Sequence, residues 1–115
     1  MNISFEAIGQ NVVTFAAGSG AEAGKVCKVT ANGTVGACAA GNSFCGVVSH
    51  VEDGAAAVIT AGYVELPYTG NTAPAVGYGA LTANGSGGVA AATTGGREYL
   101  IVSVDATAKT VGLFL

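Results

Sequence analysis

The chain has 115 residues and a net charge of −3 at pH 7, and only 10% of its residues are charged. Its four basic residues, Lys25, Lys28, Arg97 and Lys109, are scattered along the sequence, which argues against nucleic acid as a partner because such proteins gather basic residues in a patch. No apolar run reaches the roughly 18 residues of a membrane-spanning helix, and the amino terminus lacks the basic and apolar regions of a secretory signal. We therefore expect one domain that contacts no membrane and is made in a reducing compartment, as the odd number of cysteines also indicates.

Ten short strands are expected along the chain, and helix signals are nearly absent. Valine and threonine supply 15 and 11 residues, and such β-branched side chains suit a pleated sheet better than a helix. The alanine-rich runs are interrupted within a few residues by glycine, threonine or asparagine. Short strands separated by Gly, Asn and Asp turns predict an all-β fold, which we expect to be a small β-barrel. The predicted strands cover residues 11–15, 24–30, 34–39, 44–51, 55–60, 62–68, 78–83, 87–93, 98–105 and 109–115.

The sequence Thr-Ala-Asn-Gly occurs twice, at residues 30–33 and 82–85. Asn-Gly between two strands predicts a β-hairpin, because the type I′ turn needs positive φ at both central residues. A shift of 54 residues also places "CGVVSHVEDGAAAVIT" on "YLIVSVDATAKTVGLF", so that Val48 meets Val102. We therefore predict pseudo-duplicated halves, about 24–61 and 77–115, in which each half covers the apolar face of the other.

No set of residues predicts a convincing catalytic or metal site. Ser49, His50 and Asp53 would form a triad only on paper, because no nucleophile-elbow motif surrounds the serine. The three cysteines could join His50 at a zinc ion, but they lack the close pair that is typical of structural zinc sites, and cysteine also serves as a small core residue. We expect neither enzymatic activity nor a metal or cofactor.

The apolar stretch "MNISFEAIGQNVVTF" precedes the first half and has no counterpart before the second. It predicts an edge strand that closes the barrel, an arm that adds a strand to the sheet of a partner, or both. We assign residues 1–10 to an N-terminal arm and residues 11–115 to the barrel domain. The low charge agrees with a surface that partners largely cover.

Two segments, "FCGVVSHVEDGAAAVITAGYVELPY" and "GYGALTANGSGGV", resemble the small head decoration (capsid cement) proteins of bacteriophages. The likeness runs from about residue 12 to the end of the chain. It implies a compact β-barrel or β-tulip subunit that sits as a homotrimer on the expanded capsid and grips the shell with a terminal arm. By the same resemblance, the capsid-contact residues are Asn2, Ile3, Ser4, Phe5 and Glu6.

The function implied is that of a structural virion protein, made in the host cytoplasm, which binds the major capsid protein on the outside of a phage head and stabilises the head. The chain departs from the resemblance in Cys27, Cys38 and Cys45, which the resemblance does not explain.

Two other functions remain open at this point. A tail or fibre module is one, although a fibre should show more repeats or a coiled-coil or collagen-like stem. A carbohydrate-binding β-barrel is the other, because Tyr63, Tyr68 and Tyr78 lie close together in sequence and sugars stack on exposed aromatic rings. The same three tyrosines are candidate aromatics for a trimer interface.

Overall fold

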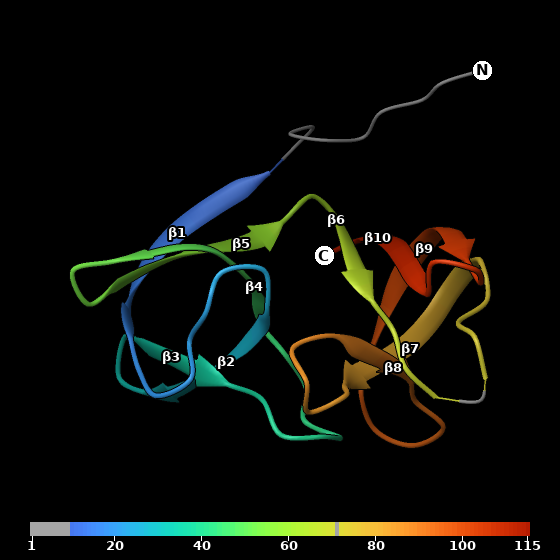
Figure 1. Cartoon of the computed structure of the whole chain (residues 1–115), viewed down its shortest axis with the longest axis horizontal. Coiled ribbons are helices and arrows are strands. Elements are labelled where there is room, and N and C mark those ends of the chain that lie inside the picture. The colour runs from blue at the N-terminus through green and yellow to red at the C-terminus, as the bar shows by residue number, and fades with distance from the viewer. Residues whose placement is uncertain (1–9, 71) are drawn as a thin grey trace.

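The computed structural model describes residues 10–70 and 72–115, and every regular element in these ranges is a β-strand (Figure 1). The all-β prediction is confirmed, and the strands begin and end within about two residues of the predicted positions. They are β1 (Asn11–Ala17), β2 (Val26–Ala31), β3 (Thr34–Ala37), β4 (Gly46–Glu52), β5 (Ala55–Ala61), β6 (Tyr63–Pro67), β7 (Gly77–Ala83), β8 (Val89–Ala91), β9 (Arg97–Asp105) and β10 (Thr110–Phe114).

The first five strands form a closed barrel in the order β1-β3-β2-β4-β5. Strand β1 closes it, pairing antiparallel with β5 and, through Ala16 and Ala17, parallel with β3. The last five strands form a second sheet in the order β6-β10-β9-β7-β8. Figure 1 shows the barrel on the left and the second sheet on the right. The barrel is therefore smaller than expected, because the first half closes on itself.

The two halves have the same topology. When β1 to β5 are matched in order with β6 to β10, every antiparallel pair in one half has an antiparallel counterpart in the other. The parallel contact that closes the barrel also has a counterpart, a single parallel bridge between Tyr68 and Val89. The pseudo-duplication is thus a property of the fold as well as of the sequence. The matched strands extend the halves beyond the predicted residues 24–61 and 77–115, because each half also includes a first strand, β1 in one and its counterpart β6 in the other.

The register of the halves differs from the predicted shift of 54 residues. The β4–β5 pairing of the first half and the β9–β10 pairing of the second half each contain one irregularity. On the side of the irregularity away from the turn, Val48 pairs with Val58 in the first half and Ile101 pairs with Leu113 in the second. Val48 therefore corresponds to Ile101 rather than to Val102, and both are buried. The reason is the turn: β4 and β5 are joined by two residues, whereas four residues join β9 and β10.

Both Thr-Ala-Asn-Gly copies lie in hairpins, as predicted, but neither forms the predicted type I′ turn. Among the described residues other than glycine, only Asp53 and Lys109 have positive φ, so Asn32 and Asn84 do not. Asp53-Gly54, between β4 and β5, does have positive φ at both central residues of its turn, 51° and 76°.

The chain has two hydrophobic cores of different size. The barrel encloses a small one, because five strands leave less interior space than the eight-stranded barrels that side chains just fill. Its buried residues are accordingly small: Cys27, Val35, Val48, Ala56 and Val58.

The larger core is built mainly from the second sheet and joins the two halves. Phe44, which precedes β4, enters this core and stacks on Tyr99 with a ring separation of 5.1 Å and an interplanar angle of 7°. The Tyr99 hydroxyl donates a hydrogen bond of 3.3 Å to the carbonyl oxygen of Phe44. Ala83 exchanges backbone hydrogen bonds with Gly41 and Asn42, at 2.9 and 2.8 Å. The halves therefore pack as one unit.

Candidate interaction surface

Within the described part of the chain, strand β1 has an open edge over most of its length. It pairs with β5 along residues 11–16, but on its other side β3 reaches only Ala16 and Ala17. Among the described residues, no strand pairs with the other edge of residues 11–15. This edge presents the main-chain groups that a further strand needs for pairing.

Both faces of β1 also carry exposed apolar side chains. Val12 and Val13 are 55% and 43% exposed, and neighbouring residues in a strand point to opposite faces. The strand, with the sequence NVVTFAA, contains no charged residue, although charges are a common means of blocking edge pairing. In its geometry and chemistry, β1 can therefore accept another strand.

The predicted site residues fall into two groups. Asn2, Ile3, Ser4, Phe5 and Glu6 lie outside the described residues. The three tyrosines do not form one exposed cluster, because Tyr63 and Tyr68 are 6% and 3% exposed within the core, whereas Tyr78 is 76% exposed.

The buried tyrosines serve the fold. The Tyr63 hydroxyl donates to Glu65 at 3.1 Å, and its ring meets Phe114 edge-on. The Tyr68 ring lies 5.5 Å from the Lys109 ammonium. Of the three, only Tyr78 presents its ring to solvent.

Tyr78 stands beside a shallow apolar hollow. Val76, 68% exposed, extends the apolar surface around it. The hollow has a volume of about 240 Å³ and is lined chiefly by small or apolar residues, among them Pro74, Ala75, Ala80, Ala91, Ala92 and Ile101.

A second hollow, of about 510 Å³, lies where the two halves meet. It is lined by β4, β5 and β6 together with Gln10 and Gly24. The Gln10 side-chain amide donates a hydrogen bond of 3.1 Å to the carbonyl oxygen of Tyr63, so this donor already serves the fold. No local sequence pattern predicts this hollow, because it is lined by five segments that meet only in the folded chain.

The residues considered for catalysis do not assemble into a site. His50 is exposed, and its Nε2 lies 3.1 Å from the carboxylate of Glu52, whereas Asp53 occupies the turn. Within residues 10–70 and 72–115, no three His, Cys, Asp or Glu side chains are grouped so that they could hold a metal ion. Nor does that part of the chain contain a helix long and apolar enough to cross a membrane.

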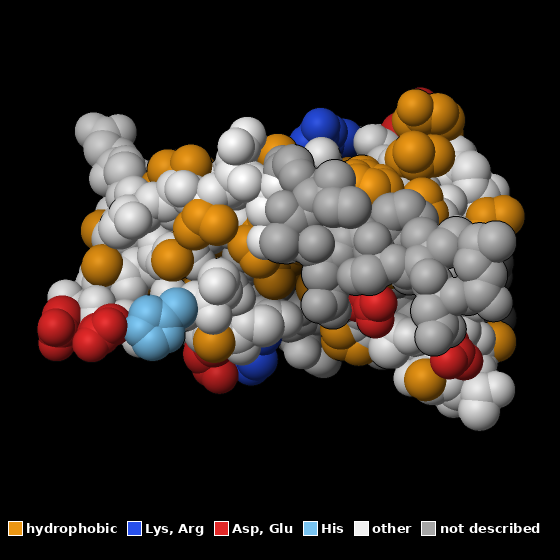
Figure 2. All heavy atoms as spheres, turned by 90° about the horizontal axis from the view of Figure 1, so that it is seen from above, with side chains coloured by type: hydrophobic (Ala, Val, Ile, Leu, Met, Phe, Trp, Pro, Cys, Tyr) orange, Lys and Arg blue, Asp and Glu red, His pale blue; other side chains and the backbone are white. Residues whose placement is uncertain are grey.

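The basic residues are dispersed over the fold and are engaged within it. Lys25 pairs with Glu22 at 3.3 Å, and the Lys28 ammonium donates to Asn42 at 2.7 Å. Arg97 lies over the Tyr99 ring, 5.2 Å from its centre. In the part of the face in Figure 2 that grey atoms do not cover, the Lys and Arg side chains, in blue, lie apart from one another among hydrophobic and neutral side chains.

Comparison with known proteins returns no matching family model and no matching curated protein. Its architecture therefore characterises the protein: the described residues form two matching all-β halves, and β1 of the closed barrel exposes two valines.

Proposed function

We propose that the chain is a decoration subunit of a bacteriophage head, which binds the major capsid protein on the outside of the capsid as a homotrimer and stabilises the shell. The observation that carries the proposal is β1, with one open edge and exposed valines on both faces. Strand addition at such an edge gains affinity from main-chain hydrogen bonds and specificity from alternating side chains. Because a capsid repeats the same contact by symmetry, a modest interface suffices for a stable shell.

The low charge of the chain supports the same proposal. Only 10% of its residues are charged, against roughly 25% in ordinary soluble domains. A subunit whose neutral surface is covered by neighbours depends less on surface charge for solubility than a monomer does.

Replacing Val13 with lysine should weaken capsid binding at least tenfold, or by about 1.4 kcal/mol. The ammonium would have to be desolvated wherever β1 is covered by a partner, whereas Val13 is 43% exposed in the free chain. Circular dichroism checks that the variant is folded. The measurement is co-sedimentation with expanded heads of the phage that encodes the chain, prepared without this protein.

Val29→Lys is the matched control, because Val29 is 55% exposed and lies on β2. It should bind as the unchanged protein does. If the unchanged protein fails to sediment with the heads, decoration is refuted; if both variants bind fully, β1 is not the contact. A mass near three times 11.0 kDa for the bound or free protein supports the homotrimer.

Tyr78 favours a second candidate, a carbohydrate-binding module. An exposed ring beside an apolar hollow can stack on the face of a sugar. For this function, a glycan array should give binding by the unchanged protein that Tyr78→Ala abolishes and Val29→Lys retains. An array without binding, together with binding to heads, eliminates this candidate.

A further inference from the structure

Cys27 and Cys45 are neighbours across two paired strands of the barrel. Cys27 lies in β2 opposite Gly46, and Cys45 directly precedes β4. The Cys45 amide donates a backbone hydrogen bond of 2.8 Å to the Cys27 carbonyl. Cys45 is one position from Gly46, the residue directly opposite Cys27, and the single hydrogen bond keeps the Cα atoms of the two cysteines at most about 6.7 Å apart. A disulfide spans Cα atoms roughly 4.4–6.8 Å apart.

Their side chains enter the same small core. Cys27 is fully buried there, and Cys45, half-buried, packs against it. Both are free thiols in this structure. The single Cys27 thiol proton has two acceptors within reach, the Gly46 carbonyl oxygen at 3.6 Å and the Cys45 sulfur.

The contact between the two thiols shifts their pKa values in opposite directions. The hydrogen bond from Cys27 lowers the pKa of Cys45 to about 7, against the opposing effect of burial. The same hydrogen bond, together with burial, raises the pKa of Cys27. Near neutral pH the more accessible Cys45 is therefore partly a thiolate, the reactive form of cysteine, while Cys27 keeps its proton.

We propose that Cys27 and Cys45 form a thiol–disulfide site, in which a hydroperoxide converts the pair reversibly into an intramolecular disulfide. In the first step the Cys45 thiolate attacks the terminal peroxide oxygen and the O–O bond breaks. Cys45 becomes a sulfenic acid, and the leaving oxygen takes a proton to form water or an alcohol. In the second step the Cys27 sulfur attacks the Cys45 sulfur, and the Cys27 proton leaves with the sulfenic hydroxyl group as water. A dithiol reductant reverses the change.

Cys38 is not part of the site. It packs in the larger core between the halves rather than in the barrel core, and burial raises its pKa. It therefore supplies a matched control: Cys38→Ala retains both reacting thiols, whereas Cys45→Ala removes the attacking one.

The test is exposure of the reduced, folded protein to hydrogen peroxide at pH 7, followed by thiol counting and peptide mapping. We expect the three thiols to fall to one, with a Cys27–Cys45 linkage within one chain and the mass of two hydrogen atoms lost. Cys38→Ala should form the same linkage, and Cys45→Ala should form none. The bond should raise the unfolding midpoint by about 5–10 °C, because it closes the loop of residues 28–44 in the unfolded chain.

The pH profile gives a second measurement, which does not depend on disulfide formation. Alkylation of Cys45 in Cys38→Ala should reach half its maximal rate near pH 7. Adding Cys27→Ala should move this midpoint upward, because the hydrogen bond is lost. A linkage that includes Cys38, a disulfide between chains, or three thiols that survive the peroxide would each overturn the proposal.

Discussion

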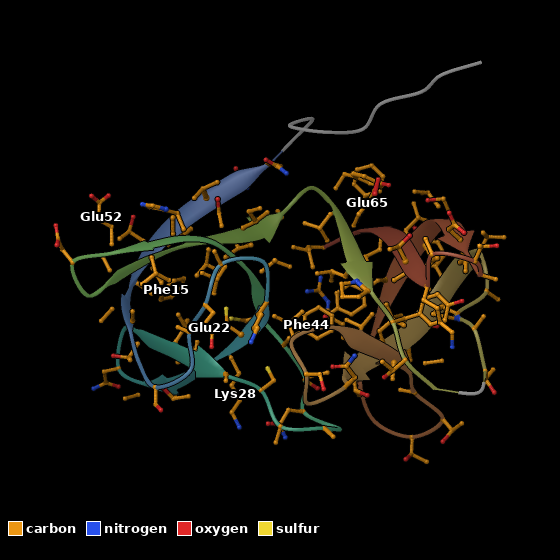
Figure 3. All side chains as sticks on the ribbon, viewed as in Figure 1. Phe15, Glu22, Lys28, Phe44, Glu52 and Glu65 are labelled. Atoms are coloured by element: carbon orange, nitrogen blue, oxygen red, sulfur yellow. The ribbon has the colours of Figure 1, made fainter. Side chains whose placement is uncertain are left out.

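Phe44→Ala should lower the free energy of unfolding by about 3–4 kcal/mol, and it should loosen the second half of the chain more than the first. The first half supplies Phe44, which is labelled in Figure 3, but the Phe44 ring packs in the core of the second half, where it stacks on Tyr99. Its removal leaves a cavity at the contact that holds the halves together, and the Tyr99 ring loses its stacking partner. Urea unfolding measures the total loss, and amide exchange in β6 to β10 should become about 100-fold faster.

Phe15→Ala is the control for this substitution. Phe15 is half-buried on β1 and packs against the barrel core. Its replacement removes the same kind of side chain, but from contacts within one half. We expect a loss of about 1.5–2 kcal/mol, with faster exchange chiefly in β1 to β5. If Phe44→Ala costs less than Phe15→Ala, or if its effect is confined to the barrel, then Phe44 does not couple the halves.

The strands could be predicted from sequence because their signals are local. Runs of β-branched residues end at glycine, asparagine or aspartate, and each such boundary is visible without knowledge of the fold. The coupling of the halves left no comparable signal. Phe44 and Tyr99 are 55 residues apart and come together only when the connector before β4 lies against the second sheet.

The burial of Tyr68 has a signal in the sequence, whereas the burial of Tyr63 has none. In β6 the exposed Glu65 and Pro67 alternate with the buried Val64 and Leu66, and Tyr68 continues the buried series. A period of two would thus have placed Tyr68 inside. Tyr63 breaks the alternation, since it is buried next to buried Val64, and no local pattern predicts it.

The internal repeat was obscured by an exchange of residues across one strand pair. In the barrel, buried Cys27 on β2 lies opposite Gly46 on β4; in the second sheet, Gly79 on β7 lies opposite buried Tyr99 on β9. In each half, one larger side chain thus lies opposite a glycine. The larger side chain is on the first strand of the pair in the barrel and on the second strand of the pair in the other sheet. An alignment that compares one strand at a time finds no likeness at these positions, although the pairs are equivalent in space.

This exchange predicts that Gly46→Ala is severely destabilising, by about 3 kcal/mol. A Cβ atom at Gly46 would collide with the Ile59 carbonyl oxygen and would lie 2.8 Å from Cγ1 of Val58. The backbone of Gly46 is not in the left-handed region, so the cost is steric and comes from overfilling the narrow barrel. The shift in the urea midpoint gives the magnitude, and loss of soluble protein would mean a larger cost still.

Gly79→Ala tests the explanation, because Gly79 is the counterpart glycine in the open sheet. A Cβ atom there meets only the end of the flexible Ile101 side chain at 3.2 Å, with the next atom 3.9 Å away. We expect the free energy of unfolding to change by no more than about 1 kcal/mol, because alanine also lowers the entropy of the unfolded chain and so offsets part of the steric cost. Equal losses for the two variants would show that the glycines serve the strand pairing itself. Unequal losses would show that closure of the first half, and not the shared topology, is what restricts its interior to the smallest residues.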